Sequence, residues 1–461
     1  MNPAAWFPVL SPWLWPSIYG LLCFLLAMGR SLSAFIFFPL GILFTVYSLW
    51  AIKPMFSTLV LGALHYDSLF FCGAMLLSLL FLVVGLMSYP QVKQAERWGL
   101  LLFLYLSALA IAAAGNLLVL FVALEMFFLL MVLWLAFFNH GQKLTGGTVR
   151  LFITGAFATG FTVFGMSFLY GVGGSLELAD IGQWASRYPS FIYGFGLLFF
   201  LVGILFKLSA VPFHHWTAEV YEDSAYPALG MLAAISKTVG VIILLRIFYH
   251  LPIPTTILMV VAAATMTLGN LGALVQSKVK RLIAFSSISH VGFMLMGIAS
   301  GNIEGFQAVA TYLVYYTLVV LALVVLLMLL RSDHDKLDDY DGLAQRHPVI
   351  AIGLTFLLLA LAGIPPTLGF MAKWKILEAA FQAHQMGLVM AAVLNSLIGG
   401  YYYLSWIFRF YMKQGGTAFY TSDRGTLLVL IALVLLCILV IFSFSPTLLF
   451  SLSHSFLTAI L

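Results

Sequence analysis

Apolar runs long enough to cross a bilayer recur along the whole chain, and this feature restricts its fold more than any other. A transmembrane helix needs about 20 consecutive, mostly apolar residues. The 461-residue chain is 63% hydrophobic and only 8% charged, whereas soluble domains carry about a quarter charged residues. A β-barrel would read as short alternating segments, and the runs do not alternate. We therefore predict an all-α polytopic membrane protein.

The polar loops between these runs predict fourteen helices. Their ranges are 8–27, 32–52, 67–89, 98–114, 116–138, 148–171, 190–216, 227–248, 253–276, 281–300, 305–330, 348–383, 387–411 and 426–447. We expect four segments: a three-helix segment 1–97, helices four to eight in 98–248, helices nine to thirteen in 249–413, and the last helix in 414–461.

The basic residues of the loops predict how the chain is oriented, because cytoplasmic loops of membrane proteins carry an excess of Lys and Arg. If the N-terminus faces outward, the outward loops keep only Lys53, Arg187 and Arg246. The inward side then carries Arg30, Lys93, Arg97, Lys143, Arg150, Lys278, Lys280, Arg281, Lys336, Arg346, Lys413 and Arg424. Both termini are thus predicted on the outer side of a bacterial inner membrane, with an organellar inner membrane as the alternative.

Several classes of site are not indicated. Cys23, Cys72 and Cys437 are isolated within apolar runs, so no iron–sulfur, zinc or haem ligation is predicted. The net charge of +5 is spread over short loops and does not indicate nucleic-acid binding.

The N-terminus lacks a basic region typical of a cleaved signal, so we expect the first helix to be retained. The acidic stretch 331–348 lacks the spacing of a calcium loop and is interpreted as a solvated face or docking surface.

Five ionisable residues remain inside the apolar runs: Glu125, Lys207, Lys237, His290 and Lys373. A charged side chain near the bilayer centre costs about 2.5–3.5 kcal/mol on insertion scales. One interpretation is that these residues form structural pairs. However, three lysines face one carboxylate, which favours a proton relay in which Glu125 controls the proton of Lys207.

Prolines mark two breaks beside these lysines. Pro212, five residues after Lys207, removes a helical donor and should free the carbonyl of Leu208. Pro365 and Pro366 should free the carbonyls of Leu361 and Ala362, eight residues before Lys373. Irregular backbone at membrane depth is tolerated where it is buried in protein or lines a wet cavity. Two such breaks in corresponding positions indicate the inverted repeats of transporters, although a packing kink is an alternative for either proline.

The histidines differ in their expected roles. His290 lies near the middle of a helix with Ser286 one turn earlier, so we interpret it as a relay member rather than a structural histidine. His214, beside the Pro212 break, is expected to have a polar role in the channel. Its neighbour His215 is expected at an interface.

Three stretches resemble a known family. "FKLSAVPFHHWTAEVYEDS", "LVQSKVKRLIAFSSISHVGFML" and "LLLALAGIPPTLGFMAKW" are similar to the antiporter-like membrane subunits of respiratory complex I. "VYED" after "FHHW" and the lysine at 373 are most similar to the subunit N (subunit 2) branch. The resemblance covers helices four to thirteen well and the first three weakly. "YEDSAYPALG" departs from the Gly-Ala-Pro-rich form that is usual in the family.

The resemblance implies a fold with two inverted five-helix repeats and one proton-translocating unit of an NADH:quinone oxidoreductase. It implies that Glu125 is the coupling glutamate, Lys207 its partner, Lys237 the central lysine and Lys373 the lysine of the exit half-channel. Arg150 stands where relatives often have lysine, and it is expected to act electrostatically because arginine stays protonated. NADH, FMN, iron–sulfur clusters and quinone would bind partner subunits, with none on this chain. The expected partners are other complex I membrane subunits and lipids, in a hetero-oligomer.

Two alternatives stay open at this point. The chain could serve a multi-subunit cation/proton antiporter without redox partners. It could also be a membrane scaffold that holds neighbouring subunits and moves no ions.

Overall fold

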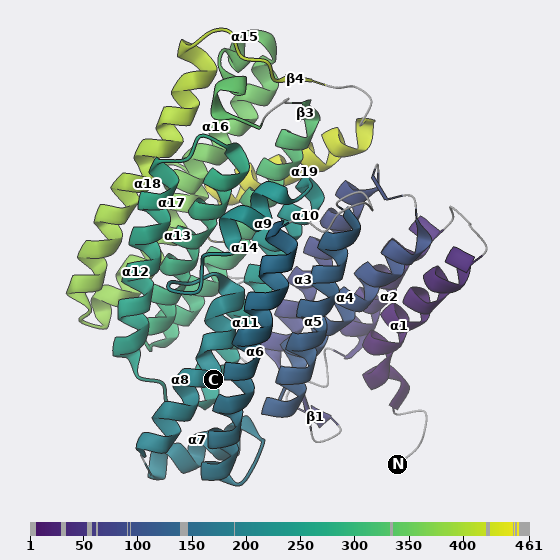
Figure 1. Cartoon of the computed structure of the whole chain (residues 1–461), viewed down its shortest axis with the longest axis vertical. Coiled ribbons are helices and arrows are strands. Elements are labelled where there is room, and N and C mark those ends of the chain that lie inside the picture. The colour runs from purple at the N-terminus through teal and green to yellow at the C-terminus, as the bar shows by residue number, and fades with distance from the viewer. Residues whose placement is uncertain are drawn as a thin grey trace. The chain divides into compact units, whose positions relative to one another are not determined.

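The computed structural model describes residues 6–28, 34–52, 58–60, 63–89, 91–92, 94–138, 146–188, 190–331, 335–420, 425–445, 447 and 450. The loop residues Arg30, Lys53, Lys93, Lys143 and Arg424, used above to orient the chain, lie outside these ranges. The described chain is almost entirely helical (Figure 1) and has thirteen helices long and apolar enough to cross a membrane. The predicted polytopic α-fold is confirmed, and the chain is a multi-pass membrane protein.

Each predicted helix has a counterpart. The predicted helix 348–383 is divided into two helices, Pro348–Ala362 and Leu368–Gln382, and the predicted helix 190–216 ends early, at Leu208. The chain divides into two compact units, with boundaries inside α8 and α11. The first unit contains the described residues of Met1–Gly203 and Ile242–Ile253. Its elements are α1 (Trp6–Met28), α2 (Ala34–Ile52), β1 (Thr58–Val60), β2 (Leu64–Tyr66), α3 (Ser68–Ser88), α4 (Ala95–Ala113), α5 (Leu117–Phe138), α6 (Gly146–Gly173), α7 (Leu178–Arg187), the first part of α8 (Phe191–Leu208) and the last part of α11 (Ser236–His250).

In the first unit α4 packs against α1, α2, α3 and α5. Helices α6 and α8 approach closely at Gly165, where an added Cβ would lie 2.3 Å from the backbone nitrogen of Phe200. In lipid the hydrophobic effect contributes little to helix association, so membrane helices associate through close packing. Small residues such as glycine let their backbones approach closely enough for this packing. The short helix α7 was not predicted, since its ten residues are too few and too polar to span a bilayer.

An ion pair with a buried arginine joins distant segments of the first unit. Arg246, only 1% exposed, donates to both carboxylate oxygens of Asp67 at 2.9 and 3.0 Å and to the carbonyl of Ala112 at 2.6 Å. Asp67 also caps α3 by accepting from the backbone nitrogen of Phe70. Burial lowers the pKa of the nearby His65, and the charge of Arg246 lowers it further. Arg246, which we counted among the basic residues of the outward side, is therefore a buried residue that stabilises the fold.

The second unit contains Ile204–Val241 and the described part of Pro254–His454. After the end of α8 come α9 (Thr217–Asp223), α10 (Tyr226–Gly230), a π-helical turn η3 (Met231–Ile235), α11 (Ser236–His250), α12 (Thr255–Leu274), α13 (Val279–Ala299), α14 (Ile303–Leu329), β3 (Leu330–Arg331), the 3₁₀ turn η4 (Leu337–Tyr340), α15 (Leu343–Arg346), α16 (Pro348–Ala362), α17 (Leu368–Gln382), α18 (Met386–Met412), β4 (Phe419–Tyr420) and α19 (Gly425–Phe444).

Helices α13 and α14 form the core of the second unit, and almost all of their residues are buried. They pack against each other and against α17, while α13 also contacts α9 and α12 (Figure 1). Both are buried on nearly every face, as expected of helices surrounded by other helices. The polar residues in the middle of α13, among them His290, are therefore enclosed by protein.

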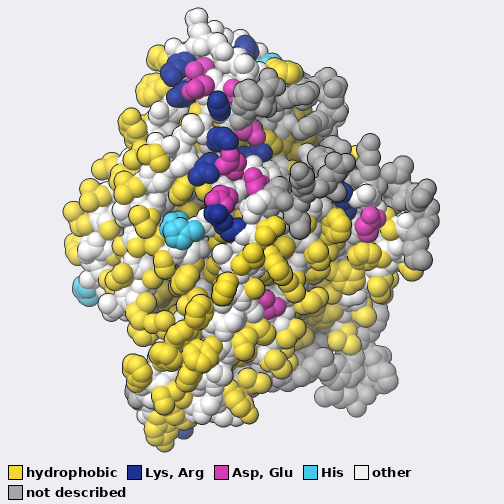
Figure 2. Space-filling model, viewed as in Figure 1, with side chains coloured by type: hydrophobic (Ala, Val, Ile, Leu, Met, Phe, Trp, Pro, Cys, Tyr) yellow, Lys and Arg dark blue, Asp and Glu magenta, His cyan; other side chains and the backbone are white. Residues whose placement is uncertain are grey.

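Charges of both signs alternate in a band across the second unit, next to a largely hydrophobic surface (Figure 2). Glu222 pairs with Lys278 and Arg281, and Lys280 pairs with Asp335 at 3.0 Å. These basic and acidic side chains form ion pairs with one another, so the band has no strong excess of positive or negative charge.

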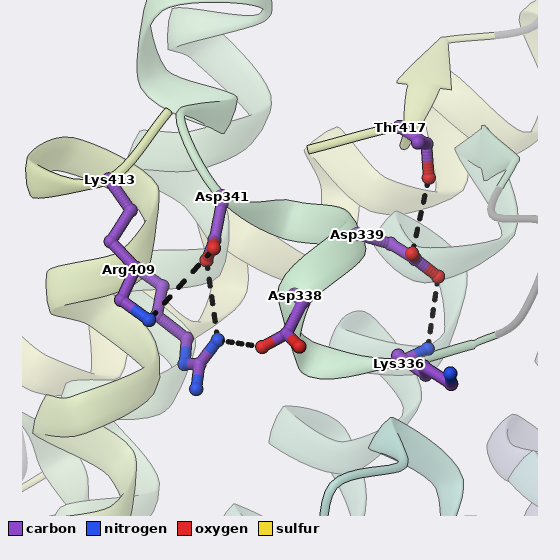
Figure 3. Close-up of polar contacts among 7 residues, drawn as sticks. All are labelled: Lys336, Asp338, Asp339, Asp341, Arg409, Lys413 and Thr417. Carbon is purple, nitrogen blue, oxygen red and sulfur yellow. Dashed lines mark hydrogen bonds and ion pairs between the residues drawn. The ribbon is translucent and has the colours of Figure 1, made fainter. Parts of the chain in front are cut away.

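The described part of the acidic stretch 331–348 includes the end of β3, the turn η4 and the helix α15. Arg409, near the end of α18, reaches Asp338 and Asp341, and Lys413 lies 4.0 Å from Asp341 (Figure 3). Asp339 accepts from Thr417 at 3.2 Å. These aspartates thus bind basic and hydroxyl side chains of the chain itself. Among the described residues no cluster of three or more His, Cys, Asp or Glu side chains could hold a metal ion.

Candidate functional site: two helix breaks and a buried histidine

Lys237 lies at the break between α8 and α9. Its ammonium donates to the carbonyl of Leu208 at 2.8 Å and to the hydroxyl of Ser209 at 2.8 Å. The ring of Trp216, on the far side of the break, lies 5.8 Å from the same nitrogen. Lys237 itself is fully buried, near the middle of the apolar span Tyr226–His250. The proline break thus frees a carbonyl, as predicted, and a lysine from another helix binds it.

The local backbone explains why that carbonyl is available. Helix α8 ends at Leu208, and Ser209 takes the left-handed conformation with φ of 61°. The backbone nitrogen of Ala210 then bonds back to the carbonyl of Leu205 at 2.9 Å, which ends the helix in a Schellman turn. Pro212 follows and cannot continue the helix. A positive charge at this end is favourable, since the C-terminus of a helix carries partial negative charge.

Lys373 lies in the same way at the second break. Its ammonium donates to the carbonyls of Leu361 at 3.2 Å and Ala362 at 2.9 Å, which end α16. Its side chain is 6% exposed, and the ring of Phe293 lies 5.1 Å from the nitrogen. The two carbonyls predicted to be freed by Pro365 and Pro366 are therefore the two that Lys373 binds.

The two breaks share one backbone design. Gly363 follows α16 in the left-handed conformation with φ of 78°, as Ser209 follows α8. The nitrogen of Ile364 bonds back to the carbonyl of Leu359 at 3.1 Å, and Pro366 is the third residue after Gly363, as Pro212 is after Ser209. In each break a buried lysine binds the last carbonyl of the preceding helix.

His290 is bonded on both ring nitrogens. Nδ1 lies 2.6 Å from the hydroxyl of Tyr312, and Nε2 lies 3.2 Å from that of Tyr403. Ser286, one turn before His290, bonds the hydroxyl of Tyr403 as well. All four side chains are buried. The polar environment that Ser286 indicated is therefore completed by tyrosines from α14 and α18.

The hydroxyl network continues beyond Tyr403. The adjacent Tyr402 donates to the amide oxygen of Asn270 at 3.3 Å, and Asn270 donates to Asn395 at 3.0 Å. On the other side of α13, the hydroxyls of Tyr221 and Ser287 lie 3.5 Å apart. An amide nitrogen has no lone pair with which to accept a proton. The hydrogen bond between Asn270 and Asn395 therefore joins α12 to α18 but does not transfer protons.

The remaining predicted residues lie in apolar helices or beside the breaks. Lys207 is buried in the last turn of α8, and Glu125 is half-buried near the middle of α5. Arg150 is exposed in the second turn of α6.

The prolines at the breaks are exposed, namely Pro212, Pro365 and Pro366. Beside the first break, His214 is half-buried and His215 is exposed. Glu125 and Lys207 belong to different units, and their pairing stays a prediction.

Two features of this candidate site were not predicted. The tyrosines around His290 resemble ordinary core aromatics in the sequence, and only the packing of α13, α14 and α18 shows where their hydroxyls lie. The π-helical turn that ends two residues before Lys237 leaves no clear pattern in "MLAAI". Such turns are often found at functional sites.

A family model described as NADH:quinone oxidoreductase/Mrp antiporter, transmembrane, matches residues 114–399, well over half of the chain. NAD(P)H-quinone oxidoreductase subunit 2 of Prochlorococcus marinus (strain AS9601) is 34% identical over 371 residues, which cover 77% of this chain and 72% of that protein. NADH-quinone oxidoreductase subunit N of Trichlorobacter lovleyi is 33% identical over 345 residues, or 72% of this chain and 71% of that one.

A solved structure gives the same result at the level of the fold. A chain of respiratory complex I from Thermus thermophilus, determined with bound aureothin, superimposes with a TM-score of 0.82 at 27% identity. The match covers 95% of this chain and 98% of that one. The chain therefore belongs to the NADH:quinone oxidoreductase/Mrp antiporter membrane family and, within it, to the group formed by subunit N and subunit 2 of the quinone oxidoreductases.

Proposed function

We propose that this chain is a proton-translocating membrane subunit of an NADH:quinone oxidoreductase. The relay consists of Glu125, Lys207, Lys237, His290 and Lys373. The names of its relatives support the complex, and one observation supports the relay: two buried lysines bind the freed carbonyls of two broken membrane helices. A bundle of membrane helices can fold without broken helices or buried lysines, and both raise the free energy of the chain within a bilayer.

The roles follow from the chemistry of each group. Lys237 and Lys373 hold a proton where helix ends stabilise positive charge, and release it when a neighbouring charge changes. His290 takes a proton on one ring nitrogen and gives one from the other.

Glu125 controls the proton of Lys207, and Arg150 contributes fixed charge near the start of α6. Ser286 and His214 support the relay with polar groups, while Pro212, Pro365 and Pro366 keep the breaks open.

The rest of the assembly follows from the same proposal. The chain contains two inverted repeats, helices four to eight in 98–248 and helices nine to thirteen in 249–413, preceded by 1–97 and followed by 414–461. The shared design of the breaks supports this division. NADH, FMN, the iron–sulfur clusters and quinone are bound by partner subunits of a hetero-oligomer. The complex lies in a bacterial inner membrane with both termini of this chain outside.

Glu125→Gln tests the relay at the residue that controls it. The amide keeps the size of the side chain and removes its charge, so the number of protons moved per electron delivered to quinone should fall below the wild-type value in vesicles containing the purified complex. Glu96→Gln, the same change in the first turn of α4, is the matched control and should leave that ratio unchanged. A fully assembled Glu125→Gln complex with the wild-type ratio would refute the proposed role of Glu125.

A further inference from the structure

Ser209 occupies a position that favours glycine. Its φ of 61° lies in the left-handed region, which residues other than glycine, Asn and Asp rarely adopt. At the matching position of the second break the chain has Gly363, with φ of 78°. The two breaks otherwise share the Schellman turn and the proline three residues later. A serine in a strained conformation, where glycine serves the twin break, calls for a function of its hydroxyl.

That hydroxyl binds Lys237. Ser209 and Lys237 are both completely buried, and the oxygen lies 2.8 Å from the ammonium nitrogen, next to the carbonyl of Leu208 at the same distance. A carbonyl oxygen only accepts hydrogen bonds, whereas a hydroxyl both accepts and donates. Ser209 can therefore accept from the ammonium and, by turning its O–H, donate to the lone pair of the neutral amine. The partners of Lys373 at its break are two carbonyls, which accept from either form of the lysine, more strongly from the ammonium, but cannot donate to the lone pair of the amine.

We propose that Ser209 is the positioning residue of Lys237, bonding the lysine in both of its protonation states. This inference rests on the proposed relay. When Lys237 releases a proton, that proton passes from the nitrogen to the next carrier, and Ser209 keeps its own proton and only reorients it. The amine thus stays fixed against the end of α8 through the whole cycle, and reprotonation restores the first arrangement. The strained serine is retained because glycine would supply the backbone turn without the hydroxyl.

The test is the pH profile of proton pumping by the complex carrying Ser209→Gly. This variant relieves the backbone strain, so it should fold at least as well as the wild type. It nevertheless removes a bond that is stronger to the ammonium than to the amine. The alkaline limb of the profile of protons moved per electron should shift to lower pH by about one unit. Ser209→Ala, which keeps the strain and loses the hydroxyl, should show the same shift.

Two further variants serve as controls. Ser209→Asn should retain a profile close to wild type, because asparagine tolerates the left-handed conformation and offers both an acceptor and a donor. Ser78→Ala removes a buried hydroxyl of α3 that bonds Tyr105 within the first unit, and it should leave the profile unchanged.

A wild-type profile for Ser209→Gly would overturn the role of Ser209, because the turn alone would then suffice. The proposed function fails separately. If Lys237→Ala pumps normally, the relay is wrong, whereas impaired Lys237→Ala beside normal Ser209→Gly refutes only this inference.

Discussion

His290 shows how the neighbours of a single buried residue set the hydrogen bonds that it can make. A neutral imidazole has one nitrogen that donates and one that accepts, and each phenol can take either role. With Tyr312 on Nδ1 and Tyr403 on Nε2, both tautomers of His290 are fully bonded. Neither tautomer leaves a buried polar atom without a partner, so the histidine can change state at little cost in hydrogen bonds.

Tyr312→Phe and Tyr403→Phe test this arrangement. Each variant keeps the ring and its packing and removes the partner of one nitrogen, which costs about 1 kcal/mol of stability and should permit assembly. Both should lower the number of protons moved per electron, measured in vesicles. Tyr105→Phe is the matched control, a completely buried tyrosine whose hydroxyl bonds Ser78 at 2.6 Å, and it should pump normally. Normal pumping by both test variants would show that His290 conducts without these hydroxyls, or not at all.

At the scale of elements, the breaks are where sequence reasoning worked best. Proline has a local effect, because the lost donor and the freed carbonyl are fixed by covalent geometry. The carbonyls of Leu208, Leu361 and Ala362 could therefore be named in advance. The residue that binds Leu208 could not, since Lys237 comes from a different helix and only tertiary packing brings it there. The sequence drew attention to Lys207, which is adjacent along the chain.

Gly363→Ala tests how the second break holds its lysine. A methyl group at this position would lie 2.8 Å from Cδ of Lys373 and 3.3 Å from its nitrogen, so the lysine side chain must shift at the break. The left-handed backbone adds a cost of about 1 kcal/mol. We expect lower proton pumping together with a lower melting temperature of the purified complex.

Gly174→Ala separates the two effects of that substitution. Gly174 has φ of 62° and nothing within 4 Å of an added methyl group, so it suffers the backbone strain alone. Its complex should melt slightly earlier and pump normally. Equal pumping by both variants would mean that the position of Lys373 at the break does not matter.

At the scale of the whole molecule, hydropathy predicted the fourteen helices because burial in lipid imposes the same requirement on every span. Contacts between distant segments could not be predicted in this way. Arg246 was counted among the basic residues of the outward side, yet it pairs with Asp67 inside the first unit. The tyrosines around His290 carry no signal apart from aromatic composition. The distant residues that line a membrane relay therefore become visible only when the helices are packed.

The scaffold alternative and the relay make opposite predictions for the whole molecule. A scaffold needs Lys237 only to satisfy the carbonyl of Leu208, a bond whose loss costs about 1–3 kcal/mol of stability and leaves transport untouched. A relay needs the exchangeable proton of Lys237. Lys375 offers a matched control, since it is exposed and pairs with Glu378 at 2.9 Å two residues after Lys373.

The number of protons moved per electron by the assembled Lys237→Ala complex is the most direct test of the relay. Vesicles with the variant complex are compared with wild-type and Lys375→Ala vesicles, with assembly checked from the full set of co-purifying subunits. The relay predicts a ratio well below wild type for Lys237→Ala and a wild-type ratio for Lys375→Ala. A wild-type ratio in the Lys237→Ala complex would contradict the relay.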